Sequence, residues 1–206
     1  YGRGEIIRAG RIPARLVFQN EAYEKAVAGF VPPKGVYSHI VGIDIVRTGP
    51  DEFFVLEDNC RTPSGVSYML ESREIMMRMF PELFRENRIE PIDNYSELLR
   101  RTLASVAPVK CDHEPTVVIL TPGHFNSAYY EHSLLADLMG VELVEGQDLF
   151  VDGEYCWMRT TEGPRRVDVI YRRIDDAYLD PLCFRPDSML GIPGLMDVYR
   201  SGGVSI

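Results

Sequence analysis

The fold class is decided by residues 116–146, TVVILTPGHFNSAYYEHSLLADLMGVELVEG. A continuous apolar run ends in a glycine turn at Gly123, a helical segment ends at Gly140, and a second short apolar run follows. Apolar strands on either side of a helix are typical of buried parallel sheets, and glycine readily closes a helix in the left-handed conformation. The stretch therefore predicts a β-α-β unit with a right-handed crossover.

Two further sheet segments are predicted on the C-terminal side. Residues 149–160, LFVDGEYCWMRT, contain an Asp-Gly turn between two short apolar runs and predict a hairpin. Residues 165–176, RRVDVIYRRIDD, predict one buried strand that ends in charged residues. Ligands of open α/β folds bind at the carboxyl edge of the sheet, so this charged end is a candidate site for a zwitterionic or peptide substrate. Its residues are Arg172, Arg173, Asp175 and Asp176. The alternative is a salt-bridged loop that fixes a domain interface.

The N-terminal half is predicted to combine helices with an antiparallel hairpin. Its expected elements are two short helices within residues 5–30 separated at Pro13, a rigid break at 32–35, strands at 36–47 and 53–59, a helix at 67–88 that restarts near Pro81, and a helix at 94–108 capped by Asn94 or Ser96. A stripe of Met and Phe on the 67–88 helix is expected to be core. A boundary near residue 108 predicts two portions, 1–108 and 109–206.

Acceptor groups are crowded at the end of the predicted hairpin. Glu57 and Asn59 lie two residues apart on one strand, so they project from the same face. A turn at residues 49–52 places Asp44 opposite Glu57, where two carboxylates repel each other unless a cation lies between them. Three oxygen ligands fit Mg²⁺. The alternative is a solvated hairpin tip without a metal.

The glycine turn of residues 121–127 is a weaker candidate. Free backbone N–H groups at the start of a helix favour an anion, so Asn126 and Ser127 are candidate substrate-binding residues. A helix cap made by either residue explains the sequence equally well. His124 and His132 are eight residues apart, too far for a paired ligand set on one helical turn, and we expect surface or capping histidines.

Composition excludes several classes of protein. The net charge of −9 argues against nucleic acid as the main partner, because phosphate backbones are bound through clustered Lys and Arg. No apolar run approaches the roughly 18 residues of a membrane helix, and no signal peptide is visible. Four cysteines without a CxxC pair are expected to be reduced thiols in a cytoplasmic protein. The sequence is compatible with a homo-oligomer but does not predict one.

The motifs GIDIV, LEDN and RTPSG together resemble the magnesium-binding end of ATP-grasp ligases. Over nearly the whole chain the sequence is similar to circularly permuted ATP-grasp proteins related to glutathionylspermidine synthetase; the stretches that carry this resemblance are VLEDNCRTPSGVSYMLESR, LTPGHFNSAYYEHSLLADLMGVELVEGQDLFV and RRVDVIYRRIDDAYLDPL. The resemblance implies an ATP-grasp-like α+β portion with the hairpin at 1–108 and a Rossmann-like, pre-ATP-grasp α/β portion at 109–206.

Residue by residue, the resemblance makes Asp44, Glu57 and Asn59 the ligands of Mg²⁺. The residues Arg61, Ser64 and Gly65 would lie beside the phosphates of ATP or beside the acceptor. Many ATP-grasp enzymes carry an arginine two residues before the aspartate, and here that place is Gly42. The phosphate-binding and catalytic arginine is therefore expected at Arg61. The nucleotide-binding lysines and glycine-rich loop are expected beyond residue 206, in a longer protein of which this chain is a fragment.

The implied reaction is ATP-dependent joining of a small-molecule or peptide carboxylate to an amine through an acylphosphate. Gly42 in place of arginine favours a second class, a catalytically inactive binding or scaffold protein. A third class, a metal-dependent hydrolase, lacks an evident histidine base. The sequence does not identify the substrates.

Overall fold

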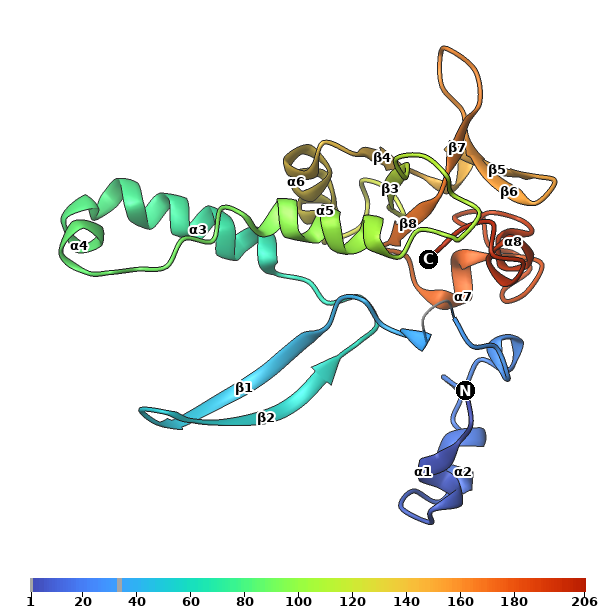
Figure 1. Ribbon diagram of the computed structural model, residues 1–206, viewed down its shortest axis with the longest axis horizontal. Coiled ribbons are helices and arrows are strands. Elements are labelled where there is room, and N and C mark those ends of the chain that lie inside the picture. Colours follow the sequence, from blue (N-terminus) through green and yellow to red (C-terminus); the bar gives the residue numbers. More distant parts are fainter. Residues whose placement is uncertain (1, 33–34) are drawn as a thin grey trace. The chain divides into compact units, whose positions relative to one another are not determined.

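The computed structural model describes residues 2–32 and 35–206, and the chain divides into two compact units, residues 1–37 and 38–206 (Figure 1). In the first unit, helices α1 (Glu5–Arg8) and α2 (Ala14–Phe18) are followed by the 3-10 turn η1 (Lys25–Val27). Pro13 is the N-cap residue of α2, so the predicted interruption at this proline is confirmed. The rigid break predicted at 32–35 includes Pro33 and Lys34, which lie outside the described residues.

The second unit begins with an antiparallel hairpin of strands β1 (Gly42–Gly49) and β2 (Glu52–Asn59). The strands face each other from Gly49 opposite Glu52 to Gly42 opposite Asn59, with one irregularity near each end of the ladder. The strand predicted from residue 36 starts only at Gly42, because β2 ends opposite that residue. Before it, the Ser38 hydroxyl donates to the carbonyls of Ile40 and Cys60, both at 3.2 Å.

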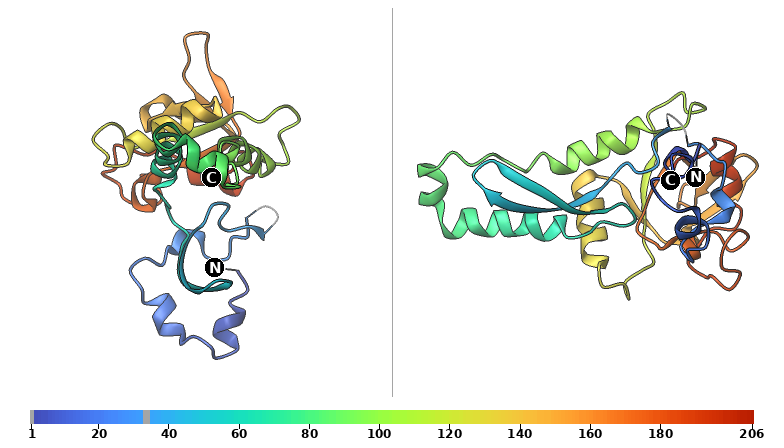
Figure 2. Two further views of the ribbon diagram at one scale, coloured as in Figure 1. Left: turned by 90° about the vertical axis from the view of Figure 1, so that its left-hand side faces the viewer. Right: turned by 90° about the horizontal axis from the view of Figure 1, so that it is seen from below.

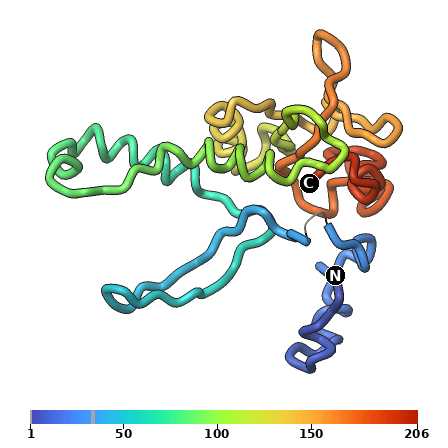
Figure 3. Tube along the Cα trace, viewed as in Figure 1, coloured from blue at the N-terminus to red at the C-terminus, as the bar shows by residue number. Residues whose placement is uncertain are grey.

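Helix α3 (Val66–Met79) follows the hairpin, and α4 (Pro81–Glu86) follows α3 directly (Figure 3). The predicted restart at Pro81 is confirmed. The prediction that the Met and Phe stripe of this region is core is wrong for the described chain, because Met69, Met76, Met77 and Phe80 are 41% to 51% exposed. Periodicity identifies the apolar face of a helix but not what covers it. Here α3 contacts α6 (Tyr129–Met139) near its start, where Ser67 is buried.

A three-stranded parallel sheet of order β4-β3-β8 forms the centre of the second unit. Its strands are β3 (Val117–Leu120), β4 (Glu142–Val144) and β8 (Val169–Arg172). Helix α6 joins β3 to β4 and ends at Gly140 with a φ of 63°, so the predicted β-α-β unit is confirmed. One face of the sheet packs against α6 and α5 (Tyr95–Ser105), as Figures 1 and 2 show. The buried residues of this core are Leu99, Leu103, Val117, Ile119, Leu135, Ala136, Met139 and Val169.

A second, antiparallel sheet has the order β5-β6-β7. Its strands are β5 (Leu149–Asp152), β6 (Tyr155–Met158) and β7 (Arg165–Val167), and the 3-10 turn η3 (Gly146–Asp148) precedes them. The hairpin predicted over residues 149–160 is confirmed. The single strand predicted over 165–176 is wrong, because Asp168 divides it into β7 and β8, which pair in different sheets. The Asp168 carboxylate is fully buried and accepts the Thr116 N–H at 3.0 Å, at the point where the chain passes from one sheet to the other.

Two short helices, α7 (Asp176–Leu179) and α8 (Leu195–Arg200), complete the second unit. The division of the chain by its contacts falls after Tyr37, and α5 packs into the core with residues beyond 108. The assignment of 1–108 and 109–206 to two family portions stays a prediction. The fold as a whole is the predicted mixture of an antiparallel hairpin and a parallel α/β sheet. Within the described residues, no helix has the length and apolar character that a membrane span requires.

Candidate functional site

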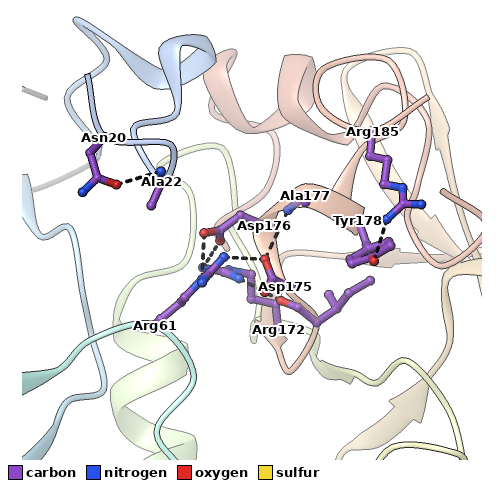
Figure 4. A network of polar contacts seen from close by, with 10 residues as sticks. Asn20, Ala22, Arg61, Arg172, Asp175, Asp176, Ala177, Tyr178 and Arg185 are labelled. Carbon is purple, nitrogen blue, oxygen red and sulfur yellow. Dashed lines mark hydrogen bonds and ion pairs between the residues drawn. The ribbon is translucent and has the colours of Figure 1, made fainter. Parts of the chain in front are cut away.

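Four charged side chains meet where the hairpin segment reaches the carboxyl edge of the parallel sheet (Figure 4). Arg61 lies two residues after β2, and its Nη2 and Nε are 2.5 Å and 3.2 Å from the carboxylates of Asp175 and Asp176. Arg172, the last residue of β8, binds the other oxygen of Asp176 at 2.5 Å. Two arginines and two aspartates neutralise one another here, and the Arg61 side chain remains 55% exposed. The cluster is therefore reachable by a ligand.

The residue that follows Arg172 forms a buried ion pair. Arg173 Nη2 is 3.0 Å from Glu131 Oε1, and the two side chains are 2% and 1% exposed. Arg173 Nη1 also donates to the Pro63 carbonyl at 2.7 Å, while Glu131 Oε2 accepts the Gly65 N–H at 2.7 Å. Two ends of one buried pair thus hold the same turn, residues 63–65, against the sheet. Because such a pair compensates the cost of burying each charge, removal of either partner is strongly unfavourable.

These contacts bear on the predicted role of the RTPSG turn. Gly65 was expected to lie beside the phosphates of ATP or the acceptor. Its N–H donates to Glu131 Oε2, and the Ser67 hydroxyl donates to the same oxygen at 3.0 Å. Gly65 has a φ of 106°, a conformation that favours glycine, and it is the N-cap residue of α3. Ser64, which precedes Gly65, is exposed. The turn therefore presents the Ser64 side chain outward and directs the Gly65 N–H inward.

The hairpin has the register that the metal prediction requires. Asp44 lies opposite Glu57, and Gly42 lies opposite Asn59. Directly opposed residues of an antiparallel pair project to the same face, so the Asp44 and Glu57 carboxylates share a face with Asn59. All three side chains belong to exposed residues. Their assignment as metal ligands stays a prediction, and the shared face satisfies its geometric condition.

Gly42 has a steric reason to be glycine. A Cβ atom built at this position would lie 2.9 Å from the Pro63 Cβ and 3.5 Å from the Asn59 Cβ. A separation of 2.9 Å between two carbons is far inside their van der Waals contact distance of about 3.5–4.0 Å. The arginine that many ATP-grasp enzymes carry here would therefore displace the turn that Arg173 and Glu131 hold.

The glycine turn after β3 lies at the same carboxyl edge, because β3 and β8 are parallel neighbours. The Asn126 carboxamide oxygen accepts the Ala128 N–H at 2.9 Å, and Ser127 is exposed. Ala128 is the N-cap residue of α6, so neither Asn126 nor Ser127 occupies the capping position that the alternative prediction gave them. Their contact with a substrate stays a prediction.

His132 corrects the expectation that both histidines are surface or capping residues. His124 is exposed beside Phe125, but His132 is 1% exposed and its Nδ1 lies 2.9 Å from the Thr121 hydroxyl. Burial, assisted by the nearby Arg173 charge, lowers the pKa of His132 to about 4, so this imidazole is neutral at pH 7. Burial also raises the pKa of Tyr171, whose hydroxyl accepts a hydrogen bond from Arg173 at 3.1 Å.

The structure brings Arg61, Arg172, Asp175 and Asp176 into one salt-bridged cluster. Both predicted roles, substrate binding and the fixing of a domain interface, stay predictions. Arg173, predicted with them, points into the protein instead. Glu131 was not predicted. Its signal in the sequence is an acidic residue four positions before Leu135, on the apolar face of the helix, where an unpaired carboxylate would be costly.

Comparison with known proteins agrees with this architecture. The family model described as a circularly permuted ATPgrasp matches residues 1–206. An uncharacterized protein of Mycobacterium tuberculosis is 55% identical over 204 residues, which are 99% of this chain and 37% of that protein. An uncharacterized protein of Synechocystis is 52% identical over 206 residues, 100% of this chain and 43% of that protein.

A third relative carries a functional name. The putative glutamate–cysteine ligase 2-2 of Frankia casuarinae is 38% identical over 208 residues, covering 100% of this chain and 24% of that protein. The chain thus spans less than half the length of these three relatives. Since the family model matches from the first residue to the last, the chain belongs to the circularly permuted ATP-grasp family.

Proposed function

We propose that the protein is an ATP-dependent ligase that joins a carboxylate to an amine, and that this chain supplies its metal-binding hairpin and part of its substrate site. The observation that carries the proposal is the register that sets Asp44 opposite Glu57, in a chain of the ATP-grasp family. The name of the Frankia relative, a putative ligase, is consistent with this class of reaction. The resemblance to relatives of glutathionylspermidine synthetase gives the finer expectation of a peptide-like substrate.

The side chains of the hairpin fit a hard divalent cation. Asp44, Glu57 and Asn59 offer oxygen atoms alone, on one face of an exposed two-stranded sheet, and Mg²⁺ prefers oxygen ligands and keeps part of its shell for water and phosphate. A bound Mg²⁺ would neutralise charge on the phosphates of ATP. Two carboxylates placed opposite each other otherwise repel, so their pairing favours a cation.

The reaction we propose has two steps. The substrate carboxylate attacks the γ-phosphorus of ATP, and ADP leaves with the bonding electron pair. The amine then attacks the acylphosphate carbon, phosphate leaves, and the amine loses a proton. Neither step needs a nucleophilic side chain, so positioning and electrostatics supply the catalysis.

The chain's own charges suit these tasks. The exposed guanidinium of Arg61 can hold a phosphoryl oxygen, because its partners Asp175 and Asp176 are themselves exposed or half-buried and can release it. Arg172 and Asp175, with Asn126 and Ser127 at the same sheet edge, would contact the carboxylate and amine substrates. Arg173 holds the turn at Pro63 in place through a hydrogen bond to the Pro63 carbonyl.

The experiment is a matched pair of substitutions in β2 of the full-length protein. Glu57→Gln removes a carboxylate from the proposed metal face, and Asp58→Asn removes the same charge one residue away, on the opposite face. ATP turnover and Mn²⁺ binding are measured with mixtures of carboxylates and amines. We expect Glu57→Gln to abolish both, and Asp58→Asn to retain them. Normal turnover in Glu57→Gln would overturn the metal assignment.

A second candidate is a binding or scaffold protein that has lost ligation, and Gly42 is the observation that favours it. The two candidates differ in one outcome. Tight nucleotide binding without phosphate release for every substrate pair would support the scaffold.

A further inference from the structure

A different set of metal-ligating side chains lies at the opposite end of strand β8. Among residues 2–32 and 35–206, Cys111, His113 and Asp168 offer one ligand atom each, and these atoms lie within 4.8 Å of one another. Cys111 and His113 belong to the loop between α5 and β3, and Asp168 separates β7 from β8. We propose that these three residues form a binding site for a transition-metal ion of the zinc class.

The distances approach those of a tetrahedral site. Cys111 Sγ is 3.8 Å from His113 Nδ1, and His113 Nε2 is 3.3 Å from Asp168 Oδ2. Metal–ligand bonds of about 2.0–2.3 Å at tetrahedral angles place neighbouring ligand atoms about 3.3–3.7 Å apart. These two distances involve different nitrogens of the His113 ring. Because one metal ion binds only one of them, the imidazole must rotate when the ion binds. The His113 side chain is 45% exposed and has room to do so.

The donor types select the kind of metal. A thiolate, an imidazole and a carboxylate are the three ligands that zinc takes in proteins, whereas Mg²⁺ and Ca²⁺ prefer oxygen alone. The site therefore does not duplicate the hairpin site of Asp44, Glu57 and Asn59. The fourth position is open to water or to Asp112, whose Oδ1 is 3.3 Å from His113 Nδ1.

Asp168 is already held in place. Its side chain is fully buried, Oδ2 accepts the Thr116 N–H at 3.0 Å, and Oδ1 lies 2.9 Å from Arg166 Nε. Asp168 Oδ1 and Arg166 Nε nevertheless have no hydrogen-bond partner, so this contact is an ion pair without hydrogen-bond geometry. A buried carboxylate that is incompletely satisfied favours a further positive charge nearby.

Arg166 limits how strongly the ion is bound. Its guanidinium lies 4.1 Å from the centre of the Tyr155 ring, which holds its charge beside Asp168. A metal ion must share the carboxylate with this cation. Without a metal, the same carboxylate lies 2.9 Å from Arg166 Nε and 3.3 Å from His113 Nε2. Because ligands bind a metal in their deprotonated form, metal binding releases protons.

The site ties the loop of residues 108–116 to the junction of the two sheets. Asp168 precedes β8 and Asp175 follows it, so the strand separates the proposed metal site from the charged cluster of Arg61. The role we assign to the ion is structural support of this loop. The inference is independent of the proposed ligase activity.

Cobalt(II) is the probe of choice, because a Co²⁺–thiolate bond gives a charge-transfer absorption in the near ultraviolet. The protein, stripped with EDTA, is titrated with Co²⁺ and then with Zn²⁺, and we expect one equivalent to produce the band and Zn²⁺ to displace it. Cys111→Ser should remove the band. Cys111→Ser and His113→Gln should each weaken Zn²⁺ binding about tenfold or more.

Two of the three other thiols provide the matched control. A Cys60→Ser, Cys183→Ser double variant should keep the band and the Zn²⁺ affinity. Asp168→Asn should bind Zn²⁺ more weakly, and circular dichroism shows whether this variant is folded. If it is unfolded, the Cys111→Ser and His113→Gln variants alone test the site. Absence of the band in the unsubstituted protein, its survival in Cys111→Ser, or unchanged Zn²⁺ affinity in His113→Gln would overturn the site.

Discussion

The guanidinium of Arg173 and the carboxylate of Glu131 form an ion pair of 3.0 Å in which both side chains are shielded from water. The pair joins the end of β8 to helix α6, and through Pro63 and Gly65 it holds the turn between the hairpin and α3. A contact between residues 42 positions apart thus positions a segment that carries candidate substrate contacts.

Glu131→Gln should be strongly destabilising. The amide keeps an oxygen acceptor but leaves the buried Arg173 charge without a counterion, so we expect a loss of about 3–5 kcal/mol in the free energy of unfolding. Denaturation in urea measures it. Asp137→Asn, on the exposed face of the same helix, serves as the control and should change stability by less than about 0.5 kcal/mol. A loss below about 1 kcal/mol in Glu131→Gln would show that the pair does not support the fold.

Stability should fall when the pH falls from about 6.5 towards 4. The pKa of His132 is about 4 in the folded chain and 6.5 without burial, so the unfolded state binds more protons in this window and is favoured as the pH drops. The full effect of one such group is about 3 kcal/mol. Unfolding free energies at pH 7, 6 and 5 measure it.

The histidine contribution can be isolated by two variants. His132→Asn keeps a polar group near Thr121 but cannot titrate, so its stability should depend less on pH than that of the unsubstituted chain. His124→Asn changes an exposed histidine four residues beyond the end of β3 and should leave the pH dependence unaltered. Identical pH profiles for all three proteins would assign the acid sensitivity to other groups.

Gly42→Ala should destabilise the hairpin end. The new methyl group would meet Pro63 at 2.9 Å, and overpacking of this kind costs about 1–3 kcal/mol. Gly49→Ala on the same strand is the control, since its added methyl group would lie at an ordinary 3.5 Å from the Glu52 Cβ. Comparison of the two unfolding free energies tests the steric explanation of Gly42. Equal unfolding free energies for the two variants would contradict this explanation.

Arg61→Ala should separate activity from stability. Its ion pairs with Asp175 and Asp176 are partly exposed, so their loss should cost less than about 1 kcal/mol of stability. Arg185→Ala, which removes another exposed arginine–aspartate pair, should be equally mild. If Arg61 holds a phosphoryl oxygen, only Arg61→Ala should lower ATP turnover, by about a hundredfold or more. Equal turnover in the two variants would assign Arg61 a structural role.

The parts of the fold that follow from local pattern were predictable. The glycine turns, the β-α-β unit and the register of Asp44 with Glu57 depend on residues close in sequence, where turn chemistry and alternation act. The charged cluster was predicted in part, because the end of an apolar strand is visible in the sequence. The participation of Arg61 in this cluster was not predicted, because its partners lie 114 and 115 positions away in the sequence.

The features that were missed depend on distant partners. Asp168 looked like one polar residue within a strand, but its carboxylate accepts the N–H of Thr116, 52 residues earlier, and breaks the strand. Glu131 was missed for the same reason, because the burial of its carboxylate depends on the ion pair with Arg173, 42 residues later in the sequence. The prediction that the Met and Phe stripe of α3 is core was wrong for another reason. Periodicity identifies the apolar face of a helix but not the segment that packs against that face.

The break at Asp168 has a consequence for cooperativity. A single residue, rather than a flexible linker, connects the antiparallel sheet to the parallel one, and its side chain is anchored at the start of β3. Opening of one sheet must therefore disturb the other. Amide hydrogen exchange should show β6, β7 and β8 losing protection as a single unit.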